Sequence, residues 1–173
     1  NTWSTALKLP ERSLDGLVLF HRPGLPVTLA EALTRVEPYM ATDAVTLVVF
    51  PNAQYWKNRG AAAVGYTPDE VFESAAWAGF IRYHHWGELD DTGKQLDPYE
   101  ENVIQLDGQT TRVTSHHEIE RLFAPTYIVQ VVHRDYDPVA HARRLAELGH
   151  PDWAYEILLA IPPAWPLEQD EWA

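Results

Sequence analysis

The chain has 173 residues, 46% of them apolar, and a formal net charge of −12, enough apolar material to fill one core without covalent crosslinks. It has no cysteine, so disulfides, thiolate metal sites and cysteine nucleophiles are excluded. The negative charge opposes direct binding to nucleic-acid phosphates, and no apolar stretch is long enough for a membrane-spanning helix. We therefore expect a soluble, cytoplasmic, single-domain protein that binds neither nucleic acid nor membrane.

The first part of the chain predicts strands alternating with helices. Residues 14–26 form a short apolar run closed by proline and glycine, typical of a strand and a turn. Thr28 followed by Glu31 is a capping box that opens a helix. Residues 43–50 are β-branched and nearly all apolar, which predicts a strand buried on both faces. Residues 52–66 have no sustained period and predict a loop with at most one helical turn.

The next stretch predicts one long helix. Thr67 and Pro68 are typical of a helix start, and large and small apolar residues repeat every three or four positions as far as Trp86. On such a helix His84 and Glu88, four residues apart, would share one face.

A hairpin and a short helix follow an acidic loop. In residues 102–114 the dipeptide Asp107-Gly108 joins two alternating runs, and it tolerates the positive φ of a tight turn. Ser115 can cap a short helix over residues 116–124.

The last part predicts a strand and two helices. Residues 126–133 have the composition of a sheet interior. Two helical stretches, 139–149 and 151–161, are separated by a very short link and should form an antiparallel hairpin. Residues 162–173 predict an extended acidic, aromatic tail. The whole chain predicts an α+β domain with a mixed sheet of four or five strands, packed helices and a C-terminal helical hairpin.

The pattern His-His-x-x-Glu occurs twice and suggests a metal site. His84 with Glu88, and His116 with Glu120, have the same spacing, so two helices would supply four ligands to one divalent ion. The alternative is structural, with the histidines placed at helix ends. The order of the residues matches neither the His-Glu-x-x-His helix nor the Glu-x-x-His bundle site.

Acidic and aromatic residues predict a surface for a basic protein partner. Carboxylates gather between residues 88 and 101, and the tail adds tryptophans, so docking would be steered by charge, although solvation alone also explains such a run. The candidate partner-binding residues are Asp90, Asp91, Asp97, Glu100, Glu101, Trp165 and Trp172.

Two hypotheses follow. The favoured one is a non-catalytic, acidic protein-binding domain, such as an inhibitor, an immunity-type protein or an assembly subunit, that docks a basic partner and needs no cofactor. The alternative is a small metal-dependent or acid–base enzyme that uses the two His-His-x-x-Glu clusters and one divalent metal ion. The separation of the two histidine pairs in space decides between them.

Overall fold

A computed structural model describes residues 9–61, 64–106 and 108–159 of the chain. The chain divides into two compact units, residues 1–134 and 135–173. The fold is α+β with a mixed sheet, which confirms the predicted class, while the division into domains stays a prediction. None of the helices in the described ranges is long and apolar enough to cross a bilayer.

The first unit is built on a four-stranded sheet with the order β1-β2-β6-β3. β1 and β2 are parallel, and β6 runs antiparallel to both of its neighbours. β1, β2 and β3 therefore all end at the same side of the sheet, which we call the carboxyl edge. The strands are β1 (Leu14–Phe20), β2 (Met40–Pro51), β3 (Phe80–Glu88) and β6 (Thr126–His133).

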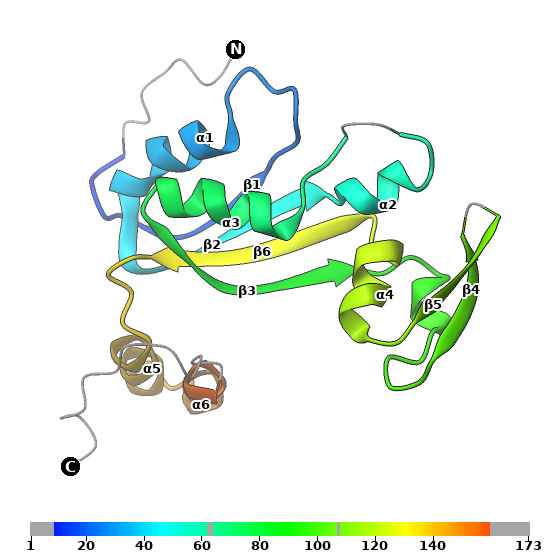
Figure 1. Cartoon of the computed structure of the whole chain (residues 1–173). Coiled ribbons are helices and arrows are strands. Elements are labelled where there is room, and N and C mark those ends of the chain that lie inside the picture. The colour runs from blue at the N-terminus through cyan, green and yellow to red at the C-terminus, as the bar shows by residue number, and fades with distance from the viewer. Residues whose placement is uncertain (1–8, 62–63, 107, 160–173) are drawn as a thin grey trace. The chain divides into compact units, whose positions relative to one another are not determined.

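Two helices cover one face of this sheet (Figure 1). α1 (Leu29–Val36) forms the crossover between β1 and β2, followed by the 3-10 turn Glu37–Tyr39, and α3 (Pro68–Trp77) lies beside it. Both begin with a complete capping box, as the sequence predicted for Thr28 and Glu31. The core between helices and sheet is mainly apolar, with the buried hydroxyl of Thr46 on β2 as an exception, and each large apolar side chain buried there contributes about 1.5–3 kcal/mol.

The predicted long helix is wrong beyond Trp77. Gly79 has φ +89°, a left-handed conformation that ends the helix, and a Cβ there would lie 2.5 Å from the guanidinium of Arg134. The chain then runs as β3, paired with β6, so His84 and Glu88 lie on a strand and not on a helix.

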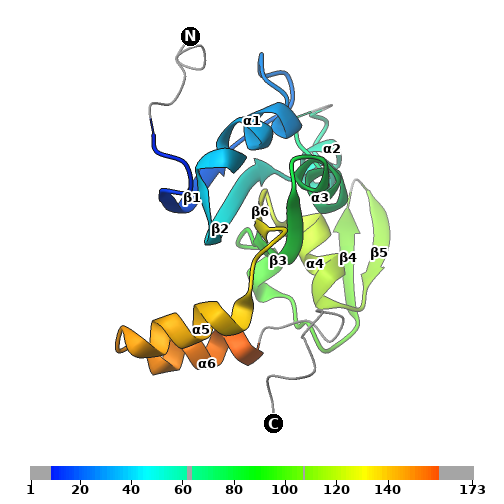
Figure 2. The same cartoon turned by 90° about the vertical axis from the view of Figure 1, so that its left-hand side faces the viewer.

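A smaller layer completes the first unit beyond the long sheet (Figures 1 and 2). The predicted hairpin is formed by β4 (Asn102–Leu106) and β5 (Gln109–Val113), with Gly108 at φ +75°. It packs on α4 (His116–Phe123), which Ser115 caps as predicted. The connecting segments also contain the short helix α2 (Ala53–Lys57) and the 3-10 turn Gly93–Gln95.

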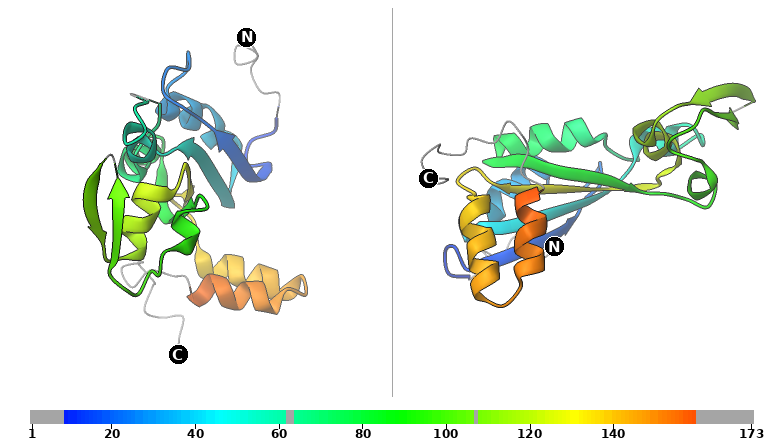
Figure 3. Two further views of the ribbon diagram at one scale, coloured as in Figure 1. Left: turned by 90° about the vertical axis from the view of Figure 1, so that its right-hand side faces the viewer. Right: turned by 90° about the horizontal axis from the view of Figure 1, so that it is seen from below.

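The second unit is a helical hairpin. α5 (Pro138–Glu147) begins at the cap Asp137, and α6 (Pro151–Leu159) follows after Gly149, whose φ of +89° turns the chain. The two helices pack side by side, as predicted (Figure 3). The predicted tail over residues 162–173 lies outside the described residues.

Candidate functional site

The four predicted metal ligands do not form one set. His84 and Glu88 are exposed on β3, where the His84 ring stacks on Trp86 at a centroid distance of 5.8 Å. His116 and Glu120 do meet on α4, with 3.4 Å between imidazole Nε2 and carboxylate Oε1. The structure thus brings His116 and Glu120 together on α4, whereas a strand and not a helix carries His84 and Glu88.

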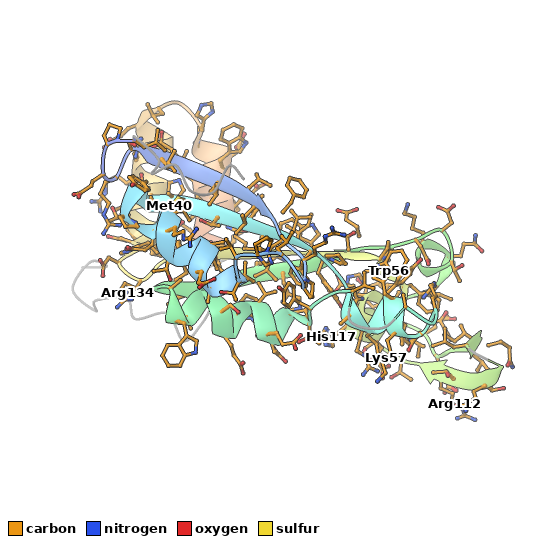
Figure 4. All side chains as sticks on the ribbon, turned by 90° about the horizontal axis from the view of Figure 1, so that it is seen from above. Met40, Trp56, Lys57, Arg112, His117 and Arg134 are labelled. Atoms are coloured by element: carbon orange, nitrogen blue, oxygen red, sulfur yellow. The ribbon has the colours of Figure 1, made fainter. Side chains whose placement is uncertain are left out.

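The other histidine of each pair converges on Glu120. Ligand atoms of His85, His117 and Glu120 all lie within 4.8 Å of one another, and these three residues are called the His-His-Glu cluster below. The rings of His85 and His117 meet edge to face with their centroids 6.0 Å apart. In Figure 4 the His117 label stands between α3 and α2.

Strand geometry decides which histidine of β3 faces the cluster. Successive strand side chains point to opposite faces, so His84 and His85 leave the strand on different sides, although their ring centroids are still 6.4 Å apart. His85 points to the helix-covered face, where its ring contacts those of Phe72 and Tyr127 at centroid distances of 5.8 and 6.1 Å. A register shift between Arg82 and His84 sets this phase, and the sequence carries no signal for it.

Glu120 is the buried member of the cluster, with 6% of its surface exposed. The backbone N–H of Gly87 donates a hydrogen bond of 2.9 Å to its Oε1 and fixes the carboxylate. Only glycine fits at position 87, because a Cβ would lie 2.6 Å from the Cβ of Ala124 and 3.2 Å from that of Glu120. α4 and β3 therefore approach closely at the point where the carboxylate is held.

Electrostatics favour the neutral form of His85. Burial lowers the pKa of this imidazole below its usual value, and the nearby Arg82 guanidinium lowers the pKa further. Arg82 donates a hydrogen bond of 3.2 Å to His85 Nδ1 and lies over the Phe72 ring. Since Nδ1 accepts this bond, the neutral ring carries its proton on Nε2.

The acidic loop forms its own local contacts. Asp90 accepts hydrogen bonds from the backbone of Thr92 and Gly93 and forms an ion pair of 3.1 Å with Arg59. Asp91 and Glu101 lie 3.8 and 3.3 Å from cationic side chains, and Asp97 accepts from the backbone of the loop. Glu100 is exposed, and the two tail residues, Trp165 and Trp172, lie outside the described residues.

No protein-family model and no curated protein matches the chain. Among solved structures it is similar to a SAM dependent methyltransferase from Archaeoglobus fulgidus, with 17% identity, a TM-score of 0.46, and coverage of 72% of this chain and 61% of that one. It is also similar to M1.HpyAVI in complex with SAM, with 12% identity and a TM-score of 0.39 over 72% of this chain and 46% of the other. A further structure of M1.HpyAVI has 11% identity and a TM-score of 0.39 over 84% and 76%. The chain thus spans about half to two thirds of the first two proteins.

These findings correct the favoured hypothesis. The similar structures include catalytic, SAM-dependent proteins, which contradicts the interpretation as a non-catalytic protein-binding domain and the expectation that no cofactor is used. The likeness itself, at TM-scores below 0.5, transfers no residue role, substrate or cofactor to this chain. The expected basic partner stays a prediction.

Proposed function

We propose that this chain binds one divalent transition-metal ion of the zinc class at His85, His117 and Glu120. The observation that carries the proposal is the convergence of two imidazoles and one buried carboxylate from separate elements, with all ligand atoms within 4.8 Å of one another. Two histidines and a glutamate are a donor set that zinc uses in catalytic sites, where a fourth position stays open to water.

The distances are compatible with binding after small side-chain rotations. Around a tetrahedral zinc with bonds of about 2.0–2.1 Å, neighbouring ligand atoms lie about 3.3 Å apart. The ligand atoms of the cluster, which are up to 4.8 Å apart, must therefore come closer to one another by roughly 1–1.5 Å. His117 is exposed on the first turn of α4, so its imidazole can rotate without disturbing the core.

Glu120 supports the proposal because it is already held in place. A buried carboxylate is unfavourable unless it is paired, and a metal ion is a stronger partner than the imidazole of His116. The hydrogen bond from Gly87 N–H fixes one oxygen, as outer partners of metal ligands do elsewhere. A zinc-class ion bound there would act as a Lewis acid and lower the pKa of a bound water.

Arg82 opposes binding and must move. If His85 binds through Nε2, its proton shifts to Nδ1, which then no longer accepts from Arg82; if it binds through Nδ1, the ion replaces Arg82. Arg82 is exposed, so its side chain can turn toward solvent. The low pKa of His85 compensates in part, because the ion competes with fewer protons.

Calorimetric titration of metal-free protein with zinc chloride tests the proposal. We expect one ion per chain, and we expect His85→Ala, His117→Ala and Glu120→Gln each to weaken the affinity by about a hundredfold or more, because each removes one of three ligands.

The matched controls are His84→Ala and Glu88→Gln, which alter the other members of the same sequence pattern. Both should leave the affinity within about twofold of the wild-type value, since their side chains lie outside the cluster. Equal losses in the controls and the cluster variants, or no saturable binding by the wild-type protein, would refute the proposal.

A further inference from the structure

A cavity lies on the carboxyl edge, outside the His-His-Glu cluster. It has a volume of about 510 Å³ and is bounded by the ends of β1 and β2, with Thr126 at the start of β6. Its size is within the range of small-molecule pockets, about 300–1,000 Å³. Ligands of sheets with parallel strands bind outside the carboxyl ends of those strands, which is the position of this cavity.

One wall of the cavity is a fixed histidine. His21 is 6% exposed, and its Nε2 donates a hydrogen bond of 3.0 Å to the carbonyl of Val27. Its Nδ1 then accepts from the hydroxyl of Tyr66 at 3.1 Å. Both ring nitrogens are therefore engaged by the protein, so His21 shapes the cavity and does not serve as its acid or base.

The lining indicates the chemical class of the ligand. Phe20 and Leu25, which are 72% and 40% exposed, present apolar surface together with Val49. Apart from the bonded His21, the lining residues with polar side chains are Arg22, which is exposed, and Thr126. Across the described part of the chain, no carboxylate forms an ion pair with Arg22, although the protein carries a net charge of −12.

We propose that this cavity binds a small organic anion whose apolar or aromatic body packs on Phe20, Leu25 and Val49 and whose carboxylate or phosphate pairs with Arg22. An arginine beside apolar walls recognises an anionic group through charge-assisted hydrogen bonds, while the apolar body supplies the contact area. The inference goes beyond the proposed metal site, because it depends on different residues and on a different part of the carboxyl edge.

The test is an NMR titration of metal-free 15N-labelled protein with indole-3-acetate and, in parallel, with the neutral analogue indole-3-acetamide. Metal-free protein prevents the carboxylate from binding to an ion. We expect the shift changes to centre on residues 20–25, 49–51 and 126, and we expect the acetate to bind about five- to tenfold more tightly than the amide.

Two variants separate the charge from the cavity. Arg22→Gln should make the two probes bind equally, whereas Arg112→Gln, on the exposed hairpin, should leave their difference unchanged (Figure 4). Leu25→Trp should weaken both probes, because its larger side chain fills the cavity.

Three results would overturn the inference. Neither probe binds saturably, or the chemical-shift changes centre on other residues, or the wild-type protein binds indole-3-acetate and indole-3-acetamide with equal affinity. The metal proposal is unaffected by any of them, because zinc binding is measured separately with the His85 and Glu120 variants.

Discussion

The His-His-Glu cluster and the cavity at β1 and β2 both contain histidine near the carboxyl edge, but the hydrogen-bond partners of the histidines differ. At the cavity, His21 is bonded through both ring nitrogens to Val27 and Tyr66. In the cluster, His85 and His117 converge on the buried carboxylate of Glu120. The hydrogen-bond partners of an imidazole therefore decide its role. An imidazole bonded through both nitrogens has a structural role, whereas one that faces a carboxylate and a second imidazole can coordinate a metal ion.

The same comparison applies to His133, which lies at the opposite end of β6. Its Nε2 lies 2.7 Å from a carboxylate oxygen of Glu37, in a hydrogen bond that ties the end of β6 to the turn after α1. A paired histidine of this kind is structural. The cluster differs because a third donor, from a separate element, faces the same point.

Gly87→Ala should break the cluster and spare the cavity, with the largest effect on stability. The added Cβ would collide with Ala124 and press on Glu120, so α4 must shift away from β3. We expect a loss of roughly 1–3 kcal/mol in the free energy of unfolding in urea, typical of overpacking, and a loss of zinc affinity. Binding of indole-3-acetate should be retained.

Gly16→Ala is the matched control for this substitution. Its Cβ would meet only the carbonyl of Val45, at an ordinary contact distance of 3.6 Å. Similar destabilisation by both substitutions would show that the close approach at Gly87 has no special role.

Arg82→Met should strengthen zinc binding. The substitution removes both the hydrogen bond to His85 Nδ1 and a positive charge near the ion, while it keeps an apolar side chain against Phe72. We expect an increase in affinity of about threefold to tenfold, since two like charges about 4 Å apart interact by roughly 1 kcal/mol in water. Calorimetry checks the result with Arg112→Met as the control; weaker binding by the Arg82 variant would contradict this account of Arg82.

The pH dependence of stability should carry a smaller contribution from His85. Burial and Arg82 lower its pKa in the folded protein, so the unfolded chain binds the proton more tightly. In metal-free protein the stability should fall as the pH drops below about 6.5, the ordinary histidine pKa, and this contribution should level off below the folded-state pKa. Urea unfolding at pH 7.5 and pH 5 should show a smaller loss for His85→Gln than for the wild-type protein. An equal loss in both proteins would exclude the effect.

Local sequence signals predicted most of the secondary structure. The capping box at Thr28, the helix start at Thr67, the turn at Gly108 and the cap at Ser115 all lie where the sequence placed them. These features depend on contacts within a few residues, which a sequence displays directly.

The prediction of one long helix was wrong because the apolar repeat continues past the residue that ends the helix. The three- and four-residue repeat that predicts the long helix runs through Gly79, whereas the positive φ of this glycine ends α3. The following residues include Phe80, Tyr83 and Trp86, and such aromatic side chains favour a strand and could have indicated the change.

The sequence predicted the types of residue in the candidate site, histidine and glutamate, but not which histidines belong to it. The sequence brought out two histidine pairs and Glu120, yet the structure selects the other histidine of each pair. That selection depends on the strand phase after Arg82 and on the approach of α4 to Gly87, both of which are tertiary features. No local pattern predicted the cavity as a whole, since its walls come from residues 20–25, 49–51 and 126, which are far apart in the chain.

Anomalous diffraction at the zinc absorption edge, from crystals grown with one equivalent of zinc, tests the central claim most directly. We predict a single strong peak about 2.0–2.2 Å from ligand atoms of His85, His117 and Glu120. A peak ligated by His84 or Glu88 instead, or no peak at the cluster, would contradict it.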